Sequence, residues 1–160
     1  MSLSSKVYQS VYSALQLLTL WRTQHQKIVF TNGCFDLLHI GHVLYLEESK
    51  SLGDILVVGI NSDASVRRLK GPNRPIQDEN SRSHVLAGLE SVDMVIIFDS
   101  DNPLELIQTI TPDILVKGGD WRMDQIVGGD FVLSHGGQVR SLRFVDGYST
   151  TAMEQKIKRG

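Results

Sequence analysis

The chain has 160 residues, of which 41% are hydrophobic and 21% charged, and its formal net charge is −2. This length fits one domain, and the composition excludes a disordered chain, a collagen-like repeat and a disulfide scaffold. The slight acidic excess indicates neither nucleic acid nor a membrane surface as a partner. The single cysteine, Cys34, has no partner for an internal disulfide, which is typical of a cytoplasmic protein.

Residues 1–26 are expected to form an N-terminal amphipathic helix. Val7, Val11 and Leu18 recur at helical spacing, and polar residues interrupt the apolar ones. Those interruptions argue against a secretory leader, and no run reaches the roughly 20 apolar residues of a membrane span. We therefore expect a helix that packs on the domain or on a second subunit, with residues 27–160 forming the domain.

From residue 27 onward, short apolar segments alternate with amphipathic ones. Five segments rich in Val, Ile and Phe predict strands: Ile28–Thr31, Ile55–Ile60, Val95–Phe98, Ile114–Val116 and Val139–Phe144. Helical patterns cover His42–Leu52, Ser81–Ser91, Pro103–Ile110, Met123–Ser134 and the residues after Ser149. This alternation predicts a Rossmann-like α/β fold with a doubly wound, five-stranded parallel sheet in the order 3-2-1-4-5.

The loop after the first predicted strand, residues 31–42, is where such a sheet binds ligands. Gly33 and Gly41 permit close approach of the backbone, and the loop leads into a helix N-terminus that favours anions. His39 and His42 face the same side of the first helical turn, an arrangement suited to a polyphosphate. A zinc pair and a simple helix cap are the alternatives, but no Cys/His cluster elsewhere supplies further zinc ligands. The neighbouring glycines favour phosphate binding.

The same segment resembles a known family. Residues 33–42 resemble the signature of the cytidylyltransferase-like nucleotidyltransferases, whose defining motif is His-x-Gly-His. Further blocks follow in the family's order: Asn61–Asp63, Lys70–Gly71, Arg82, Val116–Asp120 and Asp146–Thr151. Within the family, the chain is most similar to the branch formed by the adenylyltransferase domains of bacterial bifunctional ADP-heptose synthases, in residues 30–36, 69–71, 116–120 and 146–151.

The resemblance implies an adenylyltransferase that transfers AMP from ATP to D-glycero-β-D-manno-heptose 1-phosphate, giving ADP-heptose and pyrophosphate for lipopolysaccharide core biosynthesis. Positioning and charge neutralisation are expected to suffice, because the attacking phosphate oxygen is already an anion. Mg²⁺ is the expected cofactor, bridged by phosphates and not held by a protein side chain. A separate heptose kinase would supply the sugar phosphate, and family habit suggests a homodimer.

Two other functions stay open. One is a cytidylyltransferase for glycerol 3-phosphate or another alcohol phosphate, and the other is a nucleotide-binding module without catalysis. Phe144 stands where the glycerol-phosphate branch has an arginine, which favours the heptose branch.

By resemblance, the catalytic residues are His39, His42, Lys70 and Arg82, with Arg82 reaching the β- and γ-phosphates. The residues expected beside the sugar phosphate are Arg74, in a glycine- and proline-containing loop that suits a lid, and Trp121. The expected nucleotide-binding residues are Thr31, Asn32, Gly33, Phe35, Asp36, Gly41, Asn61, Asp63, Lys117, Gly119, Asp120, Ser149, Thr150 and Thr151.

Three of these assignments have a plain structural alternative. Asp63 suits a ribose contact and equally the N-cap of a helix that begins at Ala64. Trp121 suits the sugar side of the site or the core. Only one hydroxyl of the run 149–151 is needed to cap the last helix.

Overall fold

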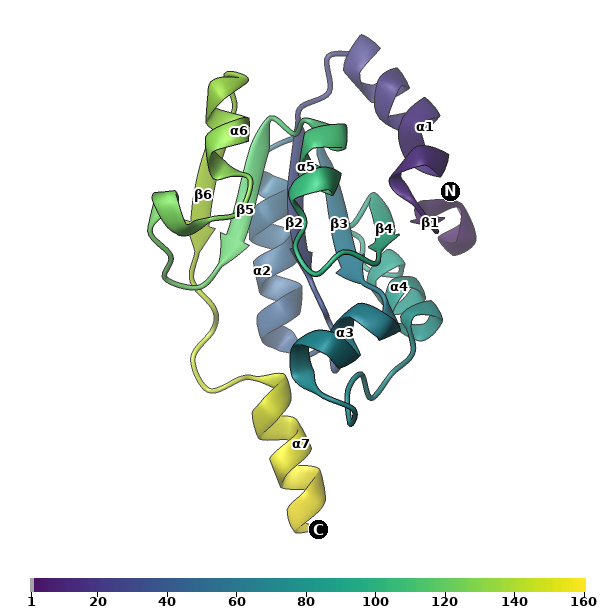
Figure 1. Cartoon of the computed structure of the whole chain (residues 1–160), viewed down its shortest axis with the longest axis vertical. Helices are drawn as coiled ribbons and strands as arrows, with labels where there is room; N and C mark the ends of the chain where they lie inside the picture. Colours follow the sequence, from purple (N-terminus) through teal and green to yellow (C-terminus); the bar gives the residue numbers. More distant parts are fainter. Residues whose placement is uncertain (1) are drawn as a thin grey trace.

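The computed structural model describes residues 2–160, in which all the strands run parallel in a six-stranded sheet (Figure 1). The strands are β1 (Val7–Tyr8), β2 (Ile28–Gly33), β3 (Ile55–Asn61), β4 (Met94–Phe98), β5 (Ile114–Gly118) and β6 (Gln138–Leu142). The helices are α1 (Val11–Thr23), α2 (Ile40–Ser51), α3 (Asp63–Lys70), α4 (Glu79–Ala87), α5 (Leu104–Ile110), α6 (Gly129–Ser134) and α7 (Thr150–Arg159). Two short 3₁₀ helices are η1 (Leu3–Lys6) and η2 (Met123–Gln125).

The strand order is β1-β4-β3-β2-β5-β6. The five strands predicted from the sequence, β2 to β6, appear in it in the predicted order 3-2-1-4-5, so the doubly wound fold is confirmed. The sheet has six strands and not the five expected, because β1 pairs with β4 at the edge of the sheet.

The N-terminal segment therefore differs from the expected single helix. Val7 and Tyr8 pair with β4, where β-branched and aromatic side chains are favoured, and they cover an edge that would otherwise be open. The helix begins only at Val11, after Ser10, whose hydroxyl accepts a hydrogen bond from the Ser13 N–H at 3.4 Å. Val11 and Leu18 then pack into the core.

Helices cover both faces of the sheet, as the apolar strands require. On one face, α1, α5 and α6 pack against alternate strand residues such as Ile28 and Phe30. On the other face, α2 and α4 pack against the intervening residues, Val29 among them (Figure 1). Each strand thus alternates its side chains between two apolar layers.

The expected helix Met123–Ser134 is divided into two shorter elements, η2 and α6. Gly128 lies between them with a φ of 81°, which favours glycine. A Cβ at this position would also lie 2.7 Å from Cδ1 of Ile107. The turn at Gly128 therefore ends the helical pattern and brings the chain close to α5.

The sheet opens between β2 and β5, at its carboxyl end. The β2–β5 pairing stops at Phe30↔Leu115, whereas the β2–β3 pairing continues as far as Gly33↔Ile60. Beyond Phe30 the two central strands therefore share no ladder. This is the point where the strand order reverses, and the loops after β2 and β5 face each other across it.

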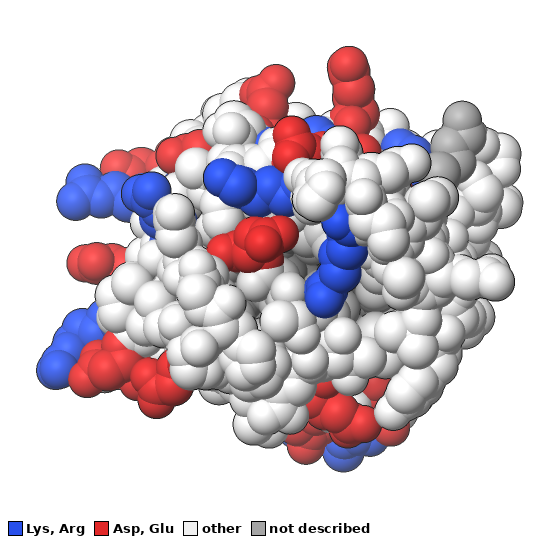
Figure 2. All heavy atoms as spheres, turned by 90° about the horizontal axis from the view of Figure 1, so that it is seen from above, with Lys and Arg blue, Asp and Glu red and all other residues white. Residues whose placement is uncertain are grey.

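The face at the amino ends of the strands, opposite α7, carries Lys, Arg, Asp and Glu side chains interspersed with one another (Figure 2). It shows no broad field of one charge. Within residues 2–160, no helix has the length and apolar character that crossing a membrane requires.

Candidate active site

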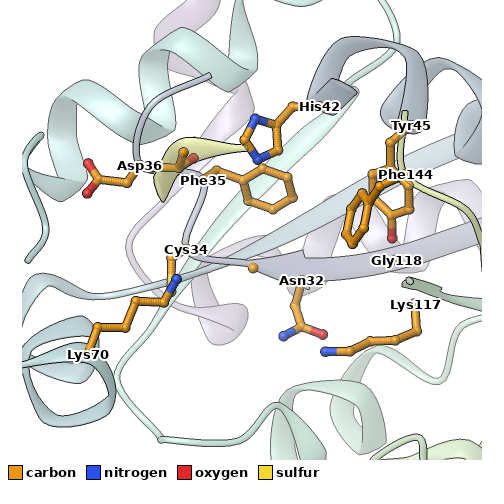
Figure 3. A pocket seen from close by; sticks show the side chains of 12 residues that line it. Asn32, Cys34, Phe35, Asp36, His42, Tyr45, Lys70, Lys117, Gly118 and Phe144 are labelled. Carbon is orange, nitrogen blue, oxygen red and sulfur yellow. The ribbon is translucent and has the colours of Figure 1, made fainter. Parts of the chain in front are cut away.

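A cavity lies at the carboxyl ends of β2 and β5 and is walled by residues from distant parts of the chain (Figure 3). The two central strands, β2 and β5, separate at this end of the sheet and form one wall of the cavity. Residues of α2, of α3 and of the segment before α7 form the rest. The lining residues are Asn32, Gly33, Cys34, Phe35, Asp36, His42, Tyr45, Lys70, Lys117, Gly118, Phe144 and Thr150. The cavity therefore lies where the sequence predicts the ligand site.

The two histidines of the signature are fixed by the backbone of their own helix turn. His39 is the N-cap of α2, and its Nδ1 accepts a hydrogen bond from the Gly41 N–H at 3.1 Å. Nδ1 of His42 accepts one from the His39 N–H at 3.3 Å. Because Nδ1 is an acceptor in both rings, the proton of each neutral ring is on Nε2. His39 therefore does cap the helix, as the simpler alternative proposed, and its Nε2 can still donate to a ligand.

Burial keeps these rings neutral. It lowers the pKa of His39, and it lowers the pKa of His42 to about 4, with the neighbouring His39 and Lys70 adding smaller effects in the same direction. The ring centroids of the two histidines are 3.9 Å apart, so two positive charges would repel strongly there. Near neutral pH the pair therefore offers two hydrogen-bond donors without carrying charge.

Gly41 is required by the position of His39. A Cβ on Gly41 would lie 2.8 Å from Cε1 and 2.9 Å from Nδ1 of His39. Gly33 is similarly close to Phe35, since its Cβ would lie 2.9 Å from the ring. Phe35 itself adopts a φ of 49°, a left-handed conformation that non-glycine residues rarely take and that tends to occur at functional sites.

Two lysines enter the cavity from opposite sides. Lys70 is the last residue of α3, and Lys117 follows the buried part of β5, with Asn32 between them in Figure 3. Burial lowers the pKa of Lys117, whose Nζ also lies 5.6 Å from the ring centre of Trp121. A triphosphate in this cavity would find cationic side chains on two sides and the His42 donor on a third.

The N-terminus of α7 supplies one lining residue, Thr150, whose hydroxyl donates to the Leu37 carbonyl at 3.1 Å. Ser149 is the N-cap, accepting a hydrogen bond from the Ala152 N–H at 3.0 Å. Thr151 is exposed and outside the cavity. One hydroxyl of the three therefore caps the helix, and another faces the site.

Three expected nucleotide-binding side chains are engaged in the protein interior. Thr31 is fully buried and shares a hydrogen bond of 2.6 Å with the Tyr45 hydroxyl. Asn61 is 4% exposed and donates to the Ser65 hydroxyl. Asp36 borders the cavity, but its carboxylate accepts the backbone N–H groups of residues 76 and 77 at 2.8 and 2.9 Å. In this structure these side chains shape the site without facing a ligand.

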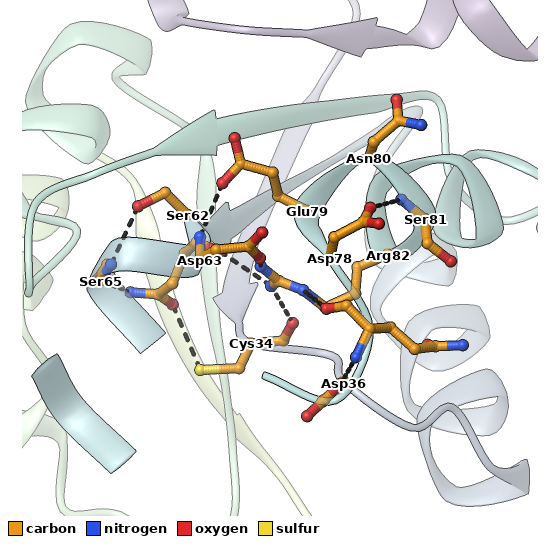
Figure 4. A network of polar contacts seen from close by, with 12 residues as sticks. Cys34, Asp36, Ser62, Asp63, Ser65, Asp78, Glu79, Asn80, Ser81 and Arg82 are labelled. Atoms are coloured by element: carbon orange, nitrogen blue, oxygen red, sulfur yellow. Dashed lines mark hydrogen bonds and ion pairs between the residues drawn. The ribbon is translucent and has the colours of Figure 1, made fainter. Parts of the chain in front are cut away.

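Arg82 is placed differently from the expectation that it reaches the β- and γ-phosphates. Its side chain is fully buried, and its guanidinium donates to the carbonyls of Cys34, Asn61 and Gln77 at 2.8 to 3.0 Å (Figure 4). It also forms an ion pair of 2.7 Å with Asp63. Since every one of these partners is protein, Arg82 joins the segments that surround the cavity and does not enter it.

Asp63 is not the helix cap, and its carboxylate has a protein partner. Ser62 caps α3, with its hydroxyl accepting from the Ser65 N–H at 3.1 Å, and Asp63 is the first helical residue. The carboxylate of Asp63 pairs with Arg82. The interpretation of Asp63 as the helix cap was therefore wrong, because Ser62 holds that position. The ribose contact stays a prediction, with the carboxylate paired to the buried guanidinium in this structure.

Arg74 lies outside the cavity lining and between two carboxylates. Its guanidinium is 3.3 Å from Asp36 and 2.5 Å from Glu154 of α7. In this structure the partners of Arg74 are these two carboxylates, and its contact with a sugar phosphate stays a prediction.

Residues after β5 form the rim of a smaller neighbouring cavity. Trp121 lines it together with Asn32 and Lys117, which border both cavities. The indole is 46% exposed, so Trp121 is not a core residue, and its Nε1 donates to the Gly118 carbonyl at 3.0 Å. Gly119 has a φ of 105° and lies beside Trp121, while the Asp120 side chain is exposed. Neither of these two lines the main cavity.

Three lining residues were not expected as site residues from the sequence: Cys34, Tyr45 and Phe144. Tyr45 lies three residues after His42 on the same helix, so helical spacing alone indicated its direction. The ring of Phe144 packs directly on Gly118, where an added Cβ would lie 2.4 Å from the Phe144 Cζ. The ring centroids of Phe144 and Tyr45 are 5.7 Å apart. No local sequence pattern brings Phe144 to Tyr45, because they meet only through the folding of β6 beside β5.

In the described part of the chain, no three His, Cys, Asp or Glu side chains gather in a way that would hold a metal ion. The donors around the cavity are instead imidazole, lysine, amide and hydroxyl groups. These groups fit an anionic ligand directly and fit a metal ion only if that ligand brings it.

Known proteins are similar to this chain. The family model described as cytidylyltransferase-like matches residues 30–152. The "Bifunctional protein HldE" of Geobacter metallireducens is 59% identical over 138 residues, which is 86% of this chain and 28% of that protein. The HldE of Syntrophotalea carbinolica is 54% identical over 145 residues, 91% of this chain and 30% of that protein. The chain thus spans less than a third of the length of these relatives.

A solved structure is also similar. The lipopolysaccharide core biosynthesis protein from Thermoplasma volcanium superposes with a TM-score of 0.62 at 35% identity, covering 78% of this chain and 99% of that one. The family match covers most of β2, all of β3 to β6, the signature histidines and the start of α7. The chain belongs to the cytidylyltransferase-like family.

Proposed function

We propose that the chain is an adenylyltransferase that transfers AMP from ATP to D-glycero-β-D-manno-heptose 1-phosphate, releasing pyrophosphate and forming ADP-heptose. The family membership supports a nucleotidyl transfer, and the relatives named HldE, with the structure named for lipopolysaccharide core biosynthesis, support the heptose substrate. We propose that the reaction takes place in the cytoplasm, where ATP is available. We also propose that the chain forms a homodimer.

One observation carries the proposal. Two neutral imidazoles, fixed through Nδ1, lie at a helix N-terminus with Nε2–H donors. His42 lines the cavity together with Lys70 and Lys117, and His39 lies just outside the lining, with its ring centroid 3.9 Å from that of His42. Donors held in place before the reaction stabilise charge that develops on phosphate oxygens without reorganisation. This arrangement suits a triphosphate whose α-phosphorus is attacked.

The chemistry divides into binding and charge stabilisation. A phosphate oxygen of the sugar phosphate attacks the α-phosphorus, the bond to the bridging oxygen breaks, and pyrophosphate leaves with the electron pair. His39 and His42 would donate to the α-phosphate region, and the two lysines would neutralise the leaving pyrophosphate. No general base is needed, because the nucleophile is already ionised.

Mg²⁺ would enter with ATP and supply further neutralisation of the phosphate oxygens. The protein groups around the cavity would bind and orient the remaining phosphate oxygens through hydrogen bonds. Trp121, which lines the smaller cavity, is the residue we propose beside the acceptor sugar phosphate.

The experiment is a substrate matrix with pyrophosphate release as the readout. The purified chain is incubated with Mg²⁺, with ATP or CTP, and with heptose 1-phosphate, glycerol 3-phosphate or no acceptor. We expect release only with ATP and heptose 1-phosphate, and ADP-heptose as the second product.

Two outcomes would overturn the proposal. Turnover only with CTP and glycerol 3-phosphate would identify the cytidylyltransferase alternative, which shares the family and the cavity. Tight ATP binding with no pyrophosphate release from any acceptor would identify a nucleotide-binding module.

A further inference from the structure

Helix α7 contacts the rest of the protein through a single narrow face. No residue between Thr150 and Arg159 is buried, and only Thr150 and Glu154 are partly covered. These two residues are four apart and therefore lie on the same side of the helix. Ile157, one turn further along, is 70% exposed, and Figure 1 shows the C-terminal half of α7 projecting away from the sheet.

The contacts on that face are polar. Thr150 donates to the Leu37 carbonyl in the signature loop at 3.1 Å. Glu154 forms an ion pair with Arg74 at 2.5 Å, in which both side chains are mostly covered, at 18% and 13% exposed. Apolar burial, which holds most helices in place, contributes little here because α7 places no side chain in the core.

Arg74 connects this ion pair to the cavity. Its other terminal nitrogen lies 3.3 Å from Asp36, which is 4% exposed and lines the cavity. Asp36 is fixed in turn by the backbone N–H groups of Ile76 and Gln77. A continuous polar chain thus runs from the cavity wall through Asp36 and Arg74 to Glu154 on α7. Partly buried links of this kind are screened less by solvent than exposed ones.

We propose that Arg74 and Glu154 form a latch that holds the N-terminus of α7 over the nucleotide cavity, with Glu154 as a positioning residue for nucleotide binding. The latch keeps Thr150 at the cavity before the nucleotide arrives. When the latch is lost, the docked state of α7 becomes less populated, and the apparent affinity for the nucleotide falls by the same fraction. The identity of that nucleotide as ATP rests on the proposed function.

The first test measures the latch without using activity. Amide hydrogen exchange of residues 144–160 is compared in the wild type, in Glu154→Gln and in Lys158→Gln. Glu154→Gln leaves the pair of Arg74 with Asp36 intact, so the cavity wall keeps its partner. Lys158→Gln is the matched control, since Lys158 pairs with the same carboxylate at 2.8 Å from within α7.

We expect exchange in α7 to accelerate about threefold to tenfold in Glu154→Gln, the change that one partly buried ion pair supports, and to stay near the wild-type rate in Lys158→Gln. Equal acceleration in both variants would overturn the latch, because it would trace the effect to the helix itself. Unchanged exchange in both would overturn it as well.

The second test separates binding from chemistry. In Glu154→Gln we expect the KM for ATP to rise about threefold to tenfold with kcat within about twofold of the wild type. A fall in kcat at unchanged KM would overturn the assignment of Glu154 to nucleotide positioning. If wild type and variant are equally inactive towards every acceptor, the proposed function fails, and the exchange data still decide the latch.

Discussion

His39 and His42 lie with their ring centroids 3.9 Å apart, and the backbone N–H of His39 donates to Nδ1 of His42. A second bond, from the Gly41 N–H to Nδ1 of His39, completes the arrangement. The helix turn thus caps itself with the two side chains that the proposed reaction uses, and the tautomer of both rings follows from the cap. Structural and functional demands on this turn are met by different nitrogens of the same rings.

That division allows the two roles to be separated by mutation. His39→Asn and His42→Asn retain an acceptor for the backbone N–H but remove the Nε2 donor. We expect each to reduce the turnover of the proposed reaction about 10²- to 10³-fold, as loss of one transition-state donor does, with little change in melting temperature. His25→Asn, at an exposed residue outside the cavity, is the control. A variant of either signature histidine with near-normal turnover would contradict the assignment.

The lowered pKa values predict how stability depends on pH. The pKa of His42 is about 4 in the folded protein and about 6.5 in the unfolded chain, so the unfolded state binds more protons between these values. The free energy of unfolding should therefore fall as the pH drops from about 6.5 to about 4, with His39 acting in the same direction. Above about pH 6.5 both rings are neutral, and neither should titrate in the activity profile.

Chemical denaturation of wild type and His42→Asn across this pH range is the measurement. The variant should show a shallower loss of stability below about pH 6.5, because the group that must be protonated on unfolding is gone. If the free energy of unfolding depends on pH with the same slope in both proteins, His42 is not held neutral by its surroundings.

Gly41→Ala tests the close approach of the signature loop to its histidine. The added Cβ would lie 2.8 Å from the His39 ring, which must then move from its place beside His42. We expect turnover to fall at least about tenfold, since small displacements of catalytic groups are costly. Gly88→Ala is the control, because Gly88 ends α4 with a φ of −72° and its Cβ would meet no side chain. Unimpaired turnover in Gly41→Ala would show that the ring position is not needed.

Arg82→Lys decides between a structural and a catalytic role for the buried arginine. The guanidinium serves three carbonyls and Asp63 from three separate nitrogens, whereas a lysine has three donors on a single nitrogen and leaves some of these buried partners unbonded. We therefore expect the free energy of unfolding to fall by more than about 2 kcal/mol. Arg68→Lys, which alters an exposed pair with Asp101, should lower the free energy of unfolding far less than Arg82→Lys does, because solvent screens that pair. Denaturant titration measures both. If the Arg82→Lys protein is fully stable and its KM for ATP is raised, Arg82 binds the triphosphate and its role is not structural.

The amino-acid sequence by itself determined the layers of the fold, the order of five strands and the place of the cavity. Short apolar runs rich in β-branched residues, such as Ile55–Ile60, favour strands covered on both faces, and parallel strands bring their carboxyl-end loops together. The signature loop with Gly33, Gly41 and the two histidines was recognisable because its chemistry is local.

Only the tertiary structure decided what the charged residues touch. Arg82, Asp63, Arg74 and Asp36 are each attractive as ligand-binding groups from the sequence, yet each finds a protein partner between 19 and 48 residues away, and Arg74 finds a second one on α7. A guanidinium or carboxylate carries the same charge whether it faces a phosphate or another side chain. Which of these it meets depends on burial and on which loops the sheet brings together, and no local pattern contains that information.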